Sequence, residues 1–79
     1  MLKLSEMQEK EVINVLSGER LGYIYDFEID LDKGTVTGII LPSDNKVVSF
    51  FSKSTDIFIE WNKIIKIGTD IILVNLKDQ

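Results

Sequence analysis

Four carboxylates recur at every second position and are the sharpest candidates for chemistry in the chain: Asp26, Glu28, Asp30 and Asp32. Carboxylate oxygens are the ligands that Ca²⁺ and Mg²⁺ prefer, so a cation site on this row is one hypothesis. An EF-hand loop does not fit, because the sixth position counted from Glu28 is Lys33 rather than glycine. Side chains two apart on a strand do not wrap an ion, so a solvated strand face is the simpler interpretation.

The side chains on which common hydrolases depend are missing. The 79-residue chain has no histidine and no cysteine, so neither a Ser-His-Asp triad nor a thiolate nucleophile can be built. The segment from Gly18 to Gly22 is too short for a P-loop and lacks its Gly-Lys-Ser/Thr ending. Paired carboxylates do acid–base catalysis only in a pocket that gives them different protonation states, which a wet strand face does not supply. We therefore expect no enzyme, no catalytic residue, no metal and no cofactor.

Charge and hydropathy limit the partners. The net charge is −4, and the nine basic residues are scattered along the chain, whereas nucleic-acid binding usually needs a clustered basic face. Nucleic acid is therefore a disfavoured partner. No apolar run approaches the roughly 20 residues of a membrane span, and the first six residues lack the apolar core of a signal peptide. We expect a cytoplasmic protein without a membrane span.

The segment from Leu21 to Leu31 is the longest predicted strand. Gly22 interrupts its early part, which predicts a bend or a bulge there. Its later even positions carry the carboxylates, so one face is expected to be buried and the other solvated. The odd positions, expected to face the core, are all apolar or aromatic: Leu21, Tyr23, Tyr25, Phe27, Ile29 and Leu31.

A tight turn is expected to follow this strand. Gly34 can adopt the positive φ that two-residue hairpin loops need. A two-residue loop ending at Gly34 pairs Phe27 with Ile40 and keeps apolar side chains on one face, which is how register is normally fixed. Residues 35–41 are then the partner strand, and Pro42 ends it.

The remaining elements are short. A capping box at Ser5–Gln8 predicts a helical turn, and a second helical turn is expected within residues 62–67. Further strands are predicted at residues 11–15, 47–52, 57–61 and 71–76. About six strands separated by regular turn signals indicate a small all-β barrel, whose closure removes exposed edges. We expect a single domain over residues 1–79.

Three segments, in this order and spacing, resemble the PRC-barrel domain family: residues 10–15, Gly18 to Asp30, and Trp61 to Asp70 followed by residues 71–74. Together they resemble the YlmC/YmxH family of sporulation proteins, small stand-alone PRC-barrel proteins of spore-forming bacteria. Glu60 stands where that family usually has proline. The resemblance implies a PRC-type barrel, a bacterial cytoplasmic setting and a link to sporulation. It brings no catalytic residues, and related PRC barrels serve as interaction modules.

The aromatic side chains could stack on bases or fill the core, and the core interpretation is favoured because no basic groove accompanies them. They are Tyr23, Tyr25, Phe27, Phe50, Phe51, Phe58 and Trp61. The strand from Val47 onward is an exception, since it is apolar on both faces and only one can point inward. Exposed aromatic residues among apolar neighbours often mark a partner surface. The candidate surface is Val47, Val48, Phe50 and Phe51.

These observations favour a non-enzymatic protein-interaction module associated with sporulation. Its protein partner is unknown, and a homodimer is one form that such a module can take. Two alternatives stay open. One is an RNA- or ribosome-associated assembly module, by analogy with the ribosome maturation factor, and the other is a metal-binding domain built on the acidic row.

Overall fold

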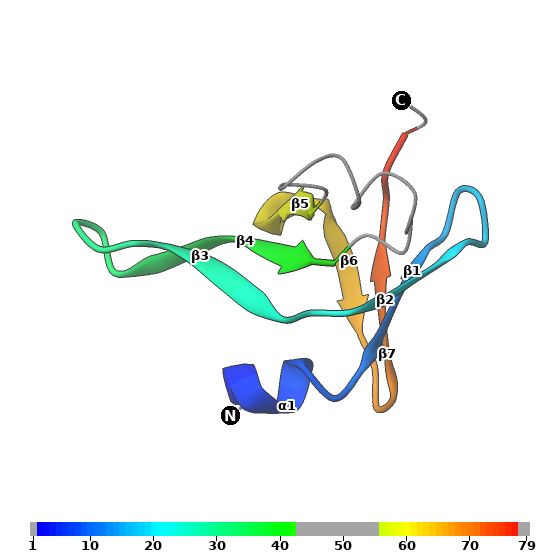
Figure 1. Cartoon of the computed structure of the whole chain (residues 1–79), viewed down its shortest axis with the longest axis horizontal. Helices are drawn as coiled ribbons and strands as arrows, with labels where there is room; N and C mark the ends of the chain where they lie inside the picture. Colours follow the sequence, from blue (N-terminus) through cyan, green and yellow to red (C-terminus); the bar gives the residue numbers. More distant parts are fainter. Residues whose placement is uncertain (1, 43–55, 78–79) are drawn as a thin grey trace, which may run out of the picture.

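A computed structural model describes residues 2–42 and 56–77, and Figure 1 shows its elements. In chain order they are α1 (Leu4–Met7), β1 (Glu11–Asn14), β2 (Arg20–Tyr23), β3 (Asp26–Asp30), β4 (Thr35–Leu41), β5 (Ile57–Glu60), the 3-10 helix η1 (Trp61–Lys63), β6 (Ile64–Ile67) and β7 (Ile71–Val74). The predicted all-β class with one or two short helical turns is confirmed. The predicted strand at residues 47–52 lies outside the described residues.

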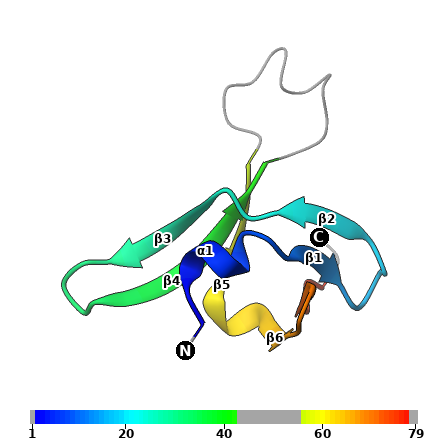
Figure 2. The same ribbon diagram turned by 90° about the horizontal axis from the view of Figure 1, so that it is seen from below.

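The strands form two sheets. One has the order β2-β1-β7-β6, with β1 and β7 parallel, and the other has the order β3-β4-β5. In Figures 1 and 2 the β3–β4 hairpin projects to one side, and the four-stranded sheet lies on the other. Within residues 2–42 and 56–77, hydrogen bonds do not close the two sheets into one barrel.

The core lies between the two sheets and is covered at one end by α1. Its members are Met7, Val12, Ile24, Ile39, Leu41, Ile59, Ile72 and Val74. They come from α1, from both sheets and from the segment that joins β2 to β3. Burying one such side chain stabilises the fold by about 1.5–3 kcal/mol, so each of these described residues makes a substantial contribution to the stability of the fold.

The prediction of one long strand from Leu21 to Leu31 is wrong. The chain crosses between the two sheets after β2, with Ile24 buried at the crossing and the Tyr25 N–H donating to the Ile40 carbonyl at 2.9 Å. The crossing breaks the alternation, and the hairpin continues past the edge of the core. Four residues predicted to face inward are therefore exposed, namely Tyr23, Tyr25, Ile29 and Leu31.

The bulge predicted near Gly22 is confirmed. Val12 pairs with Gly22 and Ile13 with Arg20, which leaves Leu21 as the extra residue on β2. Gly22 has a φ of 103°, a conformation that costs glycine little and other residues much. The bulge bends β2 just before the chain leaves the four-stranded sheet.

The hairpin turn is longer than predicted, and its register differs. The Asp30 carboxylate accepts hydrogen bonds from the N–H groups of Asp32 at 3.0 Å and Lys33 at 3.2 Å. The Asp30 carbonyl accepts from the Gly34 N–H at 2.7 Å, so residues 31–34 form the loop. Phe27 consequently pairs with Ile39 rather than with the predicted Ile40. The predicted bounds of β4, from residue 35 to residue 41, are confirmed.

Two further local predictions need correction. The first helix begins after Lys3 rather than at the predicted Ser5 capping box, and the Glu6 carboxylate accepts from the Lys3 N–H at 3.1 Å. The helical turn predicted within residues 62–67 is η1 followed by β6. Isoleucine-rich residues 64–67 pair with β7 in the sheet, because that pairing places Ile64 and Ile67 against the core.

Candidate functional site

The three-stranded sheet has one core face and one outer face. The cross-strand row Phe27–Ile39–Ile59 belongs to the core face. Neighbouring side chains along a strand point to opposite faces, so the adjacent rows lie outside. The outer face, as we use the term, consists of the rows Asp26–Ile40–Phe58 and Glu28–Gly38–Glu60. It combines an apolar middle with acidic side chains around it.

Phe58 packs over the glycine in the middle of this face. A Cβ atom added to Gly38 would come within 2.5 Å of the Phe58 Cζ atom and 2.7 Å of the Ile59 carbonyl oxygen. Glycine in a strand often marks such a close approach. The ring is held against the sheet and is still 48% exposed.

A bulge in β4 brings a polar side chain beside this ring. Glu28 pairs with Gly38 and Ile29 with Val36, which leaves Thr37 as the extra residue. The Thr37 hydroxyl donates to the Glu28 carbonyl at 3.1 Å. Bulges re-aim side chains that strict alternation would place on the other face.

The turn after β5 adds the second aromatic side chain. Glu60 is extended, with φ −64° and ψ 146°, and η1 begins immediately after it, so the chain turns at Trp61. The Trp61 side chain is 37% exposed. The Trp61 carbonyl accepts from the Ile64 N–H, which joins the turn to β6.

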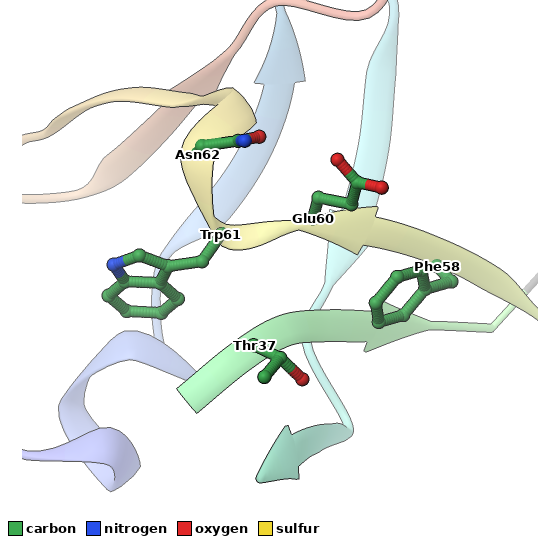
Figure 3. A pocket seen from close by; sticks show the side chains of 5 residues that line it. All are labelled: Thr37, Phe58, Glu60, Trp61 and Asn62. Carbon is green, nitrogen blue, oxygen red and sulfur yellow. The ribbon is translucent and has the colours of Figure 1, made fainter. Parts of the chain in front are cut away.

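These elements surround an open hollow of about 450 Å³, lined by Thr37, Phe58, Glu60, Trp61 and Asn62. Figure 3 shows the two aromatic rings on either side of Thr37. The lining offers two aromatic faces, one carboxylate, one hydroxyl and one amide. Aromatic anchors of this kind dominate binding at protein interfaces, and the arrangement suits recognition better than bond making. We call it the Phe58–Trp61 hollow.

A tyrosine side chain links the segments that lead into β3 and β5 of the same sheet. The Tyr25 hydroxyl donates a hydrogen bond to the Asp56 carboxylate. This hydrogen bond to Asp56 raises the pKa of Tyr25 above its ordinary value of 10.0, because it favours the protonated phenol. The bond connects the crossing segment to the residue just before β5.

The acidic row is mostly solvated, in agreement with the simpler interpretation. Asp26, Glu28 and Asp32 are exposed, and one Asp30 oxygen is used by the hairpin turn. In the part of the chain that the structure describes, no three acidic side chains come together in a way that could hold a metal ion. Of this row, Asp26 and Glu28 lie on the outer face and add negative charge to it.

The predicted partner surface of Val47, Val48, Phe50 and Phe51 lies outside the described residues. The Phe58–Trp61 hollow was missed, because its aromatic side chains were assigned to the core. That assignment is wrong for Tyr23, Tyr25, Phe58 and Trp61, all of which are exposed, and Phe27 alone of the described aromatic residues packs against the core. Gly38 inside a predicted strand indicates a close approach of another group, but the sequence does not show which side chain makes it.

No helix among residues 2–42 and 56–77 has the length and apolar character needed to cross a membrane.

The PRC-barrel domain family matches residues 1–79. The chain is 44% identical over 78 residues to "Probable sporulation protein YlmC" of Bacillus subtilis, covering 99% of this chain and 96% of that protein. It is 31% identical over 80 residues to YmxH of the same organism, covering 99% and 93%. An uncharacterized protein of Clostridium acetobutylicum is 47% identical over 72 residues, covering 91% and 82%. The chain therefore belongs to the PRC-barrel domain family and is a homologue of YlmC and YmxH.

Proposed function

We propose that the protein is a non-enzymatic protein-interaction module of sporulating cells, and that the Phe58–Trp61 hollow binds its partner. The observation that carries this proposal is the exposure of two aromatic side chains that line one hollow. The link to sporulation rests on the name of the relative YlmC. The proposed setting is the cytoplasm.

The surroundings of the hollow favour a partner that carries lysine or arginine beside apolar groups. Glu60 lines the hollow, and Asp26 and Glu28 lie on the same outer face. Opposite charges across an interface speed encounter and suppress wrong partners. A cation placed over the face of an aromatic ring stabilises a complex by about 0.5–2 kcal/mol. The Phe58 and Trp61 rings can therefore contact both the cationic and the apolar side chains of such a partner.

Affinity capture from sporulating cultures tests the proposal. The bait is the full chain as wild type, as Phe58→Ala/Trp61→Ala, and as Tyr23→Ala. Tyr23 is a matched control, because it is an exposed aromatic residue on the other sheet. We expect the same protein to be captured by wild type and control and to be lost at least tenfold from the double variant. Circular dichroism verifies that the double variant is folded, and equal capture by all three baits would refute the proposal.

A second copy of the chain is one partner that such a module can have. Light scattering of the purified protein over a range of concentrations tests this form of the proposal. A mass of two chains that falls to one in Phe58→Ala/Trp61→Ala supports it. A monomer at the highest concentration removes the homodimer and leaves the search for another protein partner.

A further inference from the structure

A second hollow, of about 210 Å³, lies at the β6 edge of the four-stranded sheet and has a different chemistry. It is lined by Asn62, Lys63, Ile65, Asn75 and Lys77. Two lysines and two asparagines therefore line one small space beside an apolar side chain. It shares only Asn62 with the Phe58–Trp61 hollow, and its chemistry is independent of the proposed function.

The backbone holds two of these residues together. The Asn75 N–H donates to the Lys63 carbonyl at 2.9 Å, which joins the end of η1 to the chain after β7. Ile64 pairs with Val74 and Lys66 with Leu73, so Ile65 is the extra residue of a bulge in β6. The bulge leaves the Ile65 side chain 55% exposed beside the hollow.

A buried asparagine, Asn14, holds the segment after β7 that supplies Asn75 and Lys77 to the hollow. Asn14 is 7% exposed. Its side-chain amide forms hydrogen bonds with both the N–H and the carbonyl of Leu76. Its Nδ2 donates to the Leu76 carbonyl and its Oδ1 accepts from the Leu76 N–H, each at 3.1 Å. Leu76 packs against the core. Because successive side chains of an extended segment alternate, Asn75 and Lys77 project to the other side, where both line the hollow.

We propose that this hollow binds a phosphate group. Ammonium groups bind phosphate through charge-assisted hydrogen bonds, and each asparagine amide adds two neutral donors. The two lysines and two asparagines that line the hollow from η1 and from the chain after β7 offer donors that suit an oxyanion with several acceptor oxygens. The net charge of −4 repels anions at long range, so the affinity comes from these local contacts and not from the overall field of the protein.

The phosphate group can belong to a free ion or to a larger molecule. The first probe is inorganic phosphate, titrated into ¹⁵N-labelled full-length protein at constant ionic strength. We expect saturable shifts of the backbone amide signals of Lys63, Ile65 and Asn75. Acetate at the same concentrations is expected to produce at most a tenth of the effect, and equal effects of acetate and phosphate would overturn the assignment to phosphate.

Variants distinguish phosphate binding at this hollow from nonspecific attraction of phosphate to surface lysines. Lys63→Gln/Lys77→Gln is expected to weaken phosphate binding at least tenfold, and Lys33→Gln in the hairpin turn is the matched control with no expected change. Both variants keep long polar side chains, and their spectra report whether they fold. Unsaturable shifts, or identical affinity in wild type and double variant, would overturn the proposal.

A short single-stranded RNA oligonucleotide distinguishes a phosphate group within a polymer from a free phosphate ion. Binding at least tenfold tighter than that of inorganic phosphate, with shifts of the same three amides, assigns the site to a phosphate within a polymer. Binding of inorganic phosphate alone assigns it to a small phosphate ligand. Both results support the site, whereas RNA shifts confined to other residues together with no phosphate binding would contradict it.

Discussion

The Phe58 ring occupies the space that a side chain at Gly38 would need. The two residues lie on adjacent strands, β5 and β4, on the outer face of the three-stranded sheet. Glycine at this position leaves room for the ring to pack against the strand. A side chain that is already packed loses less conformational entropy on binding than a mobile one, so we expect Gly38 to favour binding at the hollow without touching a partner.

Gly38→Ala is expected to destabilise the protein by about 1–3 kcal/mol, the usual cost of overpacking. The Phe58 ring can rotate away, but the Ile59 carbonyl is backbone and must shift. Urea unfolding followed by circular dichroism measures the loss. The same substitution in a Phe58→Ala background should cost less, because the ring is no longer in the way. An equal cost in both backgrounds would show that the ring does not press on residue 38.

Tyr25→Phe is expected to make stability less dependent on pH in the alkaline range. The hydrogen bond to Asp56 raises the pKa of Tyr25 above 10.0. A raised pKa of this kind contributes stability that is fully present below pH 10 and is lost as pH rises through the folded-state value. The difference in urea midpoint between wild type and Tyr25→Phe should therefore be constant near pH 8–9 and should shrink above about pH 10. Tyr23→Phe is the control, and a constant difference up to pH 11 would contradict the prediction.

Asp30→Ala is expected to cost about 1–3 kcal/mol, because it removes two hydrogen bonds worth about 0.5–1.5 kcal/mol each. These bonds, to the N–H groups of Asp32 and Lys33, fix the four-residue loop. Asp32→Ala is a matched control that removes a carboxylate from the same loop and leaves both bonds in place. Thermal unfolding of the two variants measures the difference. Equal melting temperatures would show that the loop length is set elsewhere.

Asn14→Ala is expected to destabilise the protein by about 1–3 kcal/mol, the cost of leaving partly buried backbone groups without partners. Asn14 also accepts from the Leu16 N–H at 3.2 Å, so the substitution loosens both the end of β1 and the chain after β7. Hydrogen exchange of the Leu76 and Leu16 amides reports this directly and should speed up in the variant. Asn62→Ala, on the exposed turn, is the control. Unchanged hydrogen exchange at Leu76 would show that the Asn14 side chain does not hold this segment in place.

Composition and alternation were sufficient to predict the all-β class, the bounds of β4 and the bulge near Gly22. Each rests on a local rule, such as the ban on proline inside a paired strand or the freedom of glycine at positive φ. The division of Leu21–Leu31 into two strands does not follow from local rules. It depends on Ile24 being buried where the chain crosses between sheets, which is a tertiary event.

The Phe58–Trp61 hollow was beyond sequence reasoning for a related reason. An aromatic residue in a strand fits a core and a binding surface equally well. The choice between them depends on which face of β5 meets the other sheet, and Ile59 rather than Phe58 faces inward. The position of Thr37 depends on a bulge in β4 that the apolar pattern did not reveal. The Asp30 side-chain hydrogen bonds of the four-residue loop were likewise not part of the predicted register.

The parallel pairing of β1 with β7 also has a consequence for synthesis of the chain on the ribosome. The β3–β4 hairpin needs only residues up to 41 and can form while the rest is still being made. β1 has β2 on one side early, but its other neighbour, residues 71–74, is the last of the described strands to be synthesised. Val12 and Asn14 must therefore wait for Ile72 and Val74 before the inner side of that sheet is complete. Contacts so distant in sequence slow folding, and a nascent chain that stalls before β7 exposes the apolar side of β1 to chaperones and proteases.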